Sequence, residues 1–166
     1  MKKTALETEF EANVKTYKLL IYKICRMYVN SHDDIQDLYQ DIIIQLWRSY
    51  PKFRGESKFS TWLYRIAINT ALTNFRKQKR SIQTTDTEIQ NIEIPDYSSD
   101  GIKEEQQQQL YTAIQALNDV EKSIVMLYLE DKSYDEMEEI LGISNATLRV
   151  KMNRIKDKLR TLTSNK

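Results

Sequence analysis

The stretch FSTWLYRIAINTALTNFRKQKR, residues 59–80, contains the pattern that decides the fold. Wound at 3.6 residues per turn, it places apolar and small side chains on one face of a helix and polar side chains on the opposite face. Amide, hydroxyl and guanidinium groups on one rigid face suit a phosphate backbone and base edges. A solvated basic helix is the alternative for this segment taken alone, because basic helix faces are common. The polar face consists of Arg65, Asn69, Thr73, Arg76 and Arg80.

Aromatic residues gather immediately before this helix and in its first turns. Phe53 lies in a short loop at about residues 52–58, and Phe59, Trp62 and Tyr64 follow it. Aromatic faces are surfaces on which unpaired bases can stack. The segment therefore predicts contacts with a nucleic-acid strand whose bases are exposed.

The composition favours a helical protein. The chain has 166 residues, enough for one domain or two small ones, with two prolines and three glycines. It has no apolar run of 18 residues, so we expect no membrane insertion. Acidic residues interrupt the start of the chain, so we expect no export. The single cysteine excludes an internal disulfide and suits the cytoplasm, where we expect the protein to act.

Charge is distributed unevenly along the chain, although the net charge is only +1. Residues 1–80 hold 15 Lys and Arg against 8 Asp and Glu, whereas residues 81–105 hold one lysine against 7 acids. Residues 144–166 hold 7 basic residues and one acid. Two basic zones separated by an acidic segment indicate a surface organised for a charged partner.

The periodic segments predict an all-α protein of two small helical domains joined by a flexible acidic linker. The first domain, residues 1–80, has helices at about residues 5–28, from His32 to before Pro51, and at residues 59–80. Residues 81–103 contain the linker. We expect the first helix to bury a stripe made of Leu6, Phe10, Val14, Tyr17, Ile21, Ile24 and Tyr28.

The second domain, residues 104–166, reads as a compact module that ends in a helix-turn-helix. Helices are expected at about residues 104–117, after Asn118, at residues 134–141 and from Asn145. A short helix, a turn containing Gly142 and a longer basic helix form the order of that motif. The side chains expected to point inward are Ile124, Leu127, Tyr128, Leu148, Met152, Ile155, Leu159 and Leu162.

The last helix is expected to read DNA. With Leu148 at the centre of its buried face, polar and small side chains of its first turns point outward, as major-groove recognition requires. Ser144 and the free amides around it suit a phosphate. A helical hairpin with an ordinary charged exterior is the alternative. The residues expected to contact DNA are Ser144, Ala146, Thr147, Arg149, Val150, Asn153 and Arg154.

The helix that starts near His32 has an outer face of a different kind. Ile44 is an apolar residue set among acids and an amide, and an apolar centre with a polar rim is typical of a protein-binding patch. A single exposed isoleucine is also ordinary for a protein surface. The face consists of Asp37, Gln40, Asp41, Ile44 and Arg48.

These features occur together in DIQDLYQDIIIQLWRSYPKFRGESKFSTWLYRIAINTALTNFRKQKR, residues 34–80. Over about residues 10–162, the chain resembles an extracytoplasmic-function (ECF, group 4) sigma factor of bacterial RNA polymerase, a branch of the sigma-70 family. The family pattern is D-L-x-Q-[DE], a Trp, a variable loop, W-L-x-x-I-A-x-N and a closing basic run. The matching residues are Asp37, Leu38, Gln40, Asp41, Trp47, Trp62, Leu63, Ile66, Ala67, Asn69 and Arg76.

The resemblance implies a function in transcription initiation. Residues 1–80 would be sigma region 2, which binds core polymerase through the face of Ile44 and captures and melts the −10 element. Residues 104–166 would be region 4, which reads the −35 element. The implied partners are core RNA polymerase, promoter DNA and an anti-sigma factor, which could be membrane-anchored. The −10 contacts would come from Phe53, Lys58, Phe59, Trp62, Arg65, Asn69, Thr73, Arg76 and Arg80.

The chain departs from the family pattern at several positions. Glu138 replaces a small residue expected near the helix crossing of the helix-turn-helix. Val150 stands where the recognition helix commonly has a hydroxyl, which makes the promoter sequence unreadable from this motif. Asn74 stands where the family usually has an aspartate, and it removes one charge from the region near DNA.

Rival functions have weaker support in the sequence. An enzyme would need clustered carboxylates for metal or a glycine-rich phosphate loop, and one histidine with one cysteine cannot build an ordinary zinc site. We therefore expect no catalysis, no metal and no cofactor. A conventional helix-turn-helix regulator acting without core polymerase is the main alternative, but it leaves Trp62, Asn69 and Ile44 without a role. A pure adaptor leaves the two basic zones unexplained.

Overall fold

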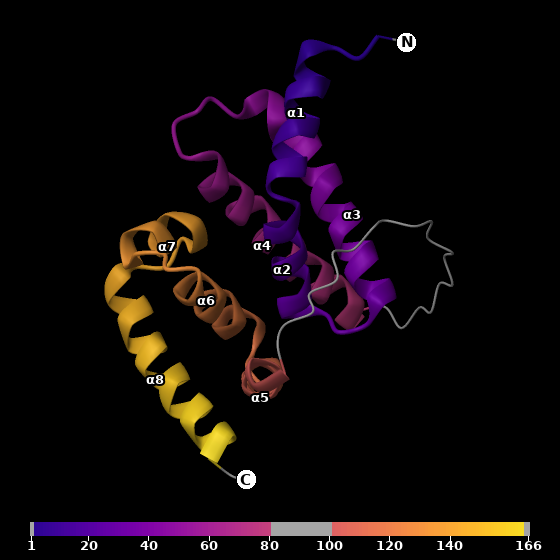
Figure 1. The fold of residues 1–166 in the computed structure, drawn as a ribbon. Helices are drawn as coiled ribbons and strands as arrows, with labels where there is room; N and C mark the ends of the chain where they lie inside the picture. Colours follow the sequence, from indigo (N-terminus) through magenta and orange to yellow (C-terminus); the bar gives the residue numbers. More distant parts are fainter. Residues whose placement is uncertain (1, 81–100, 165–166) are drawn as a thin grey trace. The chain divides into compact units, whose positions relative to one another are not determined.

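The computed structural model describes residues 2–80 and 101–164, and no side chain of residues 75–80, 101–104 or 107 is described. The described residues form α-helices and one short 3-10 helix, with no strand among them. They divide into two compact units, one containing α1 to α4 and the other α5 to α8 (Figure 1). The all-α prediction is confirmed. The expected linker lies largely outside the described residues.

The first unit is built from α1 (Ala5–Thr16), α2 (Lys18–Tyr28), α3 (His32–Ser49), the 3-10 turn η1 (Tyr50–Lys52) and α4 (Phe59–Arg80). The helix expected over residues 5–28 is divided at Tyr17, where φ is −104° and ψ is 14°. Two backbone hydrogen bonds still span the junction: Tyr17 N donates to Asn13 O, and Ile21 N donates to Tyr17 O. The division is therefore a local distortion of one helical path.

The core of the first unit lies mainly where α2 and α3 meet α4. Its fully buried side chains include Ile21, Ile42, Leu46, Leu63 and Ala67. The predicted buried stripe of residues 5–28 is confirmed only in part. Leu6 is exposed, Val14 and Tyr17 are half-buried, and the buried members are Phe10, Ile21, Ile24 and Tyr28. One turn after Leu6, the Phe10 ring lies 5.0 Å from Trp47 of α3.

The second unit contains α5 (Gly101–Gln115), α6 (Asp119–Leu129), α7 (Tyr134–Leu141) and α8 (Asn145–Ser164). Side-chain caps set the starts of α6 and α7: Asn118 Oδ1 accepts from Glu121 N at 2.8 Å, and Ser133 Oγ accepts from Glu136 N at 3.1 Å. Gly142 ends α7 in the left-handed region, with φ of 71°, which favours glycine. The expected helix-turn-helix is therefore formed.

Two side chains expected inside the second unit lie on its surface. Tyr128 is 40% exposed, and its ring is covered on one side by the Lys156 ammonium, 4.9 Å from the ring centroid. Leu162 is 44% exposed near the end of α8, beyond Leu148, Met152 and Ile155, which are buried. Apolar residues therefore continue at helical spacing along α8 beyond the part of the helix that the rest of the unit covers.

Candidate nucleic-acid and protein interfaces

The polar face of α4 forms as the helical period predicts. Arg65, Asn69 and Thr73 are exposed, while Leu63 and Ala67 on the opposite face are fully buried. Three polar side chains at steps of four residues therefore line one side of a rigid helix. Arg76 and Arg80 continue this face in sequence, but their side chains lie outside the described residues.

The aromatic residues at the start of α4 pack against one another. The Phe53 ring lies 5.0 Å from Trp62 and 5.8 Å from Phe59, and Tyr50 meets Trp62 edge-on at 6.1 Å. Phe53, Phe59 and Trp62 are half-buried, so each keeps part of its surface open. The cluster holds both ends of the loop at residues 53–58, and Lys58 is exposed at its end.

Tyr64 does not belong to this open group, contrary to the expectation that it offers a stacking surface. Its side chain is 2% exposed. α4 contacts both α2 and α3, so a residue beside the centre of its buried face is covered as well. The base-stacking candidates that remain on the surface are Phe53, Phe59 and Trp62.

The outer face of α3 has an apolar centre and a polar rim. Ile44 is 46% exposed, Asp37 and Arg48 are exposed, and Gln40 and Asp41 are half-buried. Burial, followed by the charges of Asp34, Asp41 and Asp33, raises the pKa of the Asp37 carboxyl. The face carries acidic residues, and partial burial and neighbouring carboxylates make ionisation of Asp37 less favourable than in water.

Two further residues belong to this region, although sequence reasoning did not place them there. Trp47 is 37% exposed, with its ring packed on Phe10. Trp47 lies one helical turn after Ile44, and this spacing indicates that the two side chains share the outer face of α3. Asn74 of α4 reaches across to α3, where its Nδ2 donates to Asp41 Oδ2 at 2.7 Å. This contact joins residues 33 positions apart.

The first turns of α8 present the surface expected of a recognition helix. Ala146, Thr147, Val150, Asn153 and Arg154 are all exposed, as is Arg149, whereas Leu148, Met152 and Ile155 are buried. Ser144 Oγ accepts from Thr147 N at 3.3 Å and donates to Thr147 Oγ1 at 2.8 Å. Ser144 therefore caps the helix and orients the Thr147 hydroxyl.

Arg149 is held by neighbours that sequence reasoning did not single out. Its Nε donates to Asn145 Oδ1 at 2.8 Å, and its guanidinium carbon lies 4.5 Å from the centroid of the Tyr134 ring. Asn145 and Arg149 are four residues apart, a spacing that predicts contact between side chains on a helix. The contact with Tyr134 crosses the turn between two helices, and no local pattern predicts it.

Cys25 lies apart from these faces. Cys25 is fully buried, and burial raises the pKa of its thiol to about 12. Within residues 2–80 and 101–164, no three His, Cys, Asp or Glu side chains are placed to hold a metal ion. No helix in that part of the chain is long and apolar enough to span a membrane.

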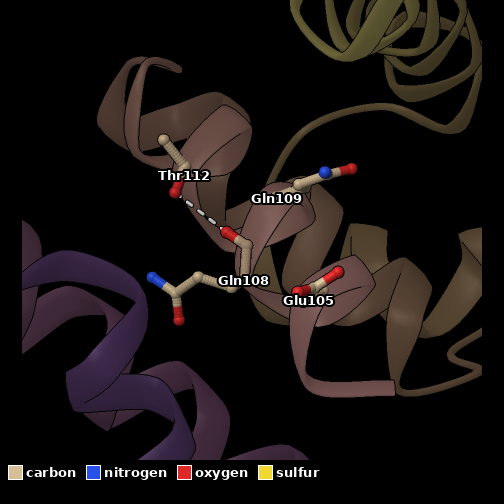
Figure 2. A pocket seen from close by; sticks show the side chains of 4 residues that line it. All are labelled: Glu105, Gln108, Gln109 and Thr112. Atoms are coloured by element: carbon tan, nitrogen blue, oxygen red, sulfur yellow. Dashed lines mark hydrogen bonds between the residues drawn. The ribbon is translucent and has the colours of Figure 1, made fainter. Parts of the chain in front are cut away.

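An open, polar depression runs along α5. Figure 2 shows its lining side chains on successive turns of that one helix, with the Thr112 hydroxyl donating to the Gln108 carbonyl oxygen at 2.8 Å. Glu105 supplies the one charged group of this lining. The lining residues are Glu105, Gln108, Gln109 and Thr112.

Comparison with known families accounts for both units. The family model of Sigma-70 region 2 matches residues 14–81, and that of Sigma-70 region 4 matches residues 107–159. The ECF RNA polymerase sigma-E factor of Haemophilus influenzae is 30% identical over 161 residues, covering 89% of this chain and 84% of the relative. The chain belongs to the ECF RNA polymerase sigma factors. Its function is that of an RNA polymerase sigma factor.

Other relatives of this sigma factor agree. The ECF RNA polymerase sigma-E factor of Escherichia coli K12 is 30% identical, with 89% of this chain and 83% of the relative covered. Among solved structures, the sigma factor RpoE in complex with the anti-sigma factor NepR, from Bartonella quintana, matches with a TM-score of 0.73 at 22% identity. That match covers 95% of this chain and 98% of the neighbour.

A second solved neighbour is CnrH in complex with the cytosolic domain of CnrY, with a TM-score of 0.66 at 17% identity. It covers 93% of this sigma factor and 87% of the neighbour. The alternative of a conventional helix-turn-helix regulator is not favoured, because the matches include the N-terminal unit as well as the helix-turn-helix. Sigma factors as a family are transcription initiation factors, not enzymes.

Proposed function

We propose that this sigma factor divides promoter recognition between its two units, with residues 1–80 as region 2, residues 81–103 as a connecting linker and residues 104–166 as region 4. The observation that supports this division is the pairing of two exposed polar helix faces, on α4 and on the start of α8, each backed by a buried apolar face. Each unit can therefore present a rigid surface to DNA.

The proposed polymerase contact is the outer face of α3. Ile44 offers an apolar anchor, and the surrounding acids and amide supply the polar rim that interfaces commonly have. The pKa of Asp37 is raised by burial and by neighbouring carboxylates. A basic side chain on the partner would therefore stabilise the ionised form of Asp37. The proposed contact residues are Asp37, Gln40, Asp41, Ile44 and Arg48.

The proposed −10 contact uses α4 and the loop before it. Half-buried aromatic rings are fixed by one another, so a base could stack on their open surface without reordering the loop. Asn69 and Thr73 add hydrogen-bonding groups, and the basic residues neutralise phosphates. The proposed residues are Phe53, Lys58, Phe59, Trp62, Arg65, Asn69, Thr73, Arg76 and Arg80.

The proposed −35 contact is the exposed face of α8 in the major groove. Arginine and asparagine side chains there can read purine edges, while Ala146 and Val150 suit a thymine methyl group. Ser144 lies at the helix start, where a phosphate is favoured. The proposed residues are Ser144, Ala146, Thr147, Arg149, Val150, Asn153 and Arg154.

Further partners and location follow from this role. We propose that the sigma factor acts in the cytoplasm with core RNA polymerase and that it catalyses no reaction itself. An anti-sigma factor is proposed as its regulator, since one solved neighbour was crystallised with the anti-sigma factor NepR and another was solved with the cytosolic domain of CnrY.

The division of labour can be tested by footprinting. Core polymerase reconstituted with the full chain is incubated with genomic fragments, and the bound fragments are recovered, sequenced and footprinted. We expect protection of two short elements on one face of the duplex and permanganate-reactive thymines at the downstream element. Arg154→Ala should weaken the upstream footprint, and Asn69→Ala should reduce the permanganate reactivity. A single protected element with no reactive thymines would contradict the proposed division.

A further inference from the structure

A chain of polar contacts crosses the turn of the helix-turn-helix and ends at Arg149. Asn145 Nδ2 donates to Asp135 Oδ1 at 2.8 Å, while Asn145 Oδ1 accepts from Arg149 Nε at 2.8 Å. The guanidinium carbon of Arg149 lies over the Tyr134 ring, 4.5 Å from its centroid. Two residues at the start of α7 and one at the start of α8 thus set the position of one arginine on α8.

These contacts leave one part of the guanidinium available. Nε donates to Asn145 and the guanidinium carbon lies over the Tyr134 ring, while the terminal nitrogens Nη1 and Nη2 have no hydrogen-bond acceptor among the described residues of the chain. Nη1 and Nη2 form the end-on fork of arginine, whose geometry matches two acceptors side by side. In the major groove, O6 and N7 of guanine are such a pair.

Apolar side chains also lie between the two helices of the motif. Met137 and Ile140 of α7 and Leu148 of α8 are buried, and the turn between the helices is set by the left-handed conformation of Gly142. Arg149, in contrast, is exposed. An exposed arginine fixed on two sides has lost its rotamer freedom before DNA arrives, which lowers the entropic cost of binding.

We propose that Tyr134 and Asn145 are positioning residues that fix Arg149 for end-on recognition of one guanine in the −35 element. This inference rests on the proposed function, in which Arg149 contacts the −35 element. Tyr134 and Asn145 then determine specificity at one base pair through Arg149. Asp135 orients the Asn145 amide, so that its oxygen faces Arg149 Nε.

The test uses the full chain bound to core RNA polymerase and a pool of promoter duplexes with a randomised −35 element. Bound duplexes are sequenced for the wild type, Arg149→Ala, Tyr134→Leu and Asn145→Ala. Tyr134→Phe is the matched control, because it keeps the ring under the guanidinium and loses only the hydroxyl. Thermal unfolding of each variant checks that the helix-turn-helix is intact.

We expect guanine at one position to be enriched about tenfold over the other bases, and Arg149→Ala to remove this enrichment. Tyr134→Leu and Asn145→Ala should each reduce it to about threefold at that position and leave the other positions unchanged. Tyr134→Phe should keep the wild-type enrichment. If Tyr134→Leu does not fold, Asn145→Ala carries the test.

Two kinds of result would overturn the inference for different reasons. If Arg149→Ala removes the preference but Tyr134→Leu and Asn145→Ala keep it, or weaken binding to all sequences equally, then the two residues do not position Arg149. The same holds if the base that depends on Arg149 is not guanine. If Arg149→Ala leaves every preference intact, the proposed −35 role of Arg149 has failed, and the inference fails with it.

Discussion

Asn74 Nδ2 donates a hydrogen bond to Asp41 Oδ2 at 2.7 Å, joining the helix proposed to bind −10 DNA to the helix proposed to bind polymerase. The family usually has an aspartate at the position of Asn74, and here that aspartate would set a second carboxylate against Asp41. The contact with Asp41 therefore explains why an asparagine suits this position in this chain. It ties α4 to α3 through a hydrogen bond to Asp41.

Asn74→Asp should destabilise the first unit, because two carboxylates would meet where an amide now donates. At neutral pH we expect a loss of about 2–3 kcal/mol in the free energy of unfolding, measured by urea denaturation. The repulsion raises a carboxyl pKa in the folded state, so the loss should shrink as the pH falls towards 4. Asn74→Ala, which adds no charge, should cost about 1–2 kcal/mol at both pH values. Equal costs for the two variants at neutral pH would refute this account of the contact.

Cys25 should be protected from alkylation in the native protein, since its thiol is fully buried and its pKa is raised to about 12. Iodoacetamide should label it only after denaturant is added. The unfolded thiol ionises near 9.0 and the folded thiol near 12, so the folded state holds the proton longer. Stability should therefore fall as pH rises above 9.0, by more in the wild type than in Cys25→Ala. Rapid labelling of the native protein would contradict the burial.

The ion pair between Glu121 and Lys158 should stabilise the second unit. Lys158 Nζ lies 2.7 Å from Glu121 Oε2, and the Glu121 side chain is only 12% exposed. Burial alone would raise the pKa of Glu121, but the Lys158 hydrogen bond, the Asn118 amide and the charges of Lys158 and Lys151 together lower it. Glu121→Gln should therefore cost about 1 kcal/mol at neutral pH in thermal unfolding.

The sign of the pH dependence follows from the lowered pKa. The contribution of Glu121 is present above its unfolded value of 4.5 and is lost as the pH falls through the lower folded value. Asp157→Asn is the matched control, because Asp157 and Arg160 form an ion pair at 3.7 Å in which both side chains are 78% exposed. Its effect on stability should be negligible. A control variant as destabilised as Glu121→Gln would show that partial burial of Glu121 is not what matters.

Much of this architecture is predictable from sequence because it is local. The capping residues Thr4, Asn118 and Ser133 mark helix starts, and the left-handed residue Gly142 marks a helix end. Polar faces follow from the helical period alone, so the exposure of Asn69 was predictable. All of these signals lie within a few residues of the feature they specify.

The contacts that organise the sites lie beyond such signals. The partner of Asn74 is 33 positions away, and the ring beneath Arg149 belongs to another helix. Burial also depends on how many helices pack against a given helix. Tyr64 is buried because α4 packs against both α2 and α3, whereas Leu162, near the end of α8, is exposed. Periodicity defines a face, but tertiary packing decides its width.

Ile44→Asp should impair binding of core polymerase without unfolding the protein. Ile44 is 46% exposed, so the substitution should change the free energy of unfolding by less than about 0.5 kcal/mol. Placing a charge at the apolar centre of the interface should lower affinity about tenfold or more, measured by titrating labelled sigma factor with core enzyme. Leu19→Asp is the matched control, because Leu19 is 42% exposed on α2 and outside the proposed face. If both variants bind core equally well, the docking face is misassigned.

The most direct test of the central claim is run-off transcription with core RNA polymerase, with and without the full chain, on the genomic fragments that the reconstituted holoenzyme selects. We predict a discrete transcript that requires the chain and is lost with Ile44→Asp. Transcription that is identical with and without the chain on every selected fragment would contradict it.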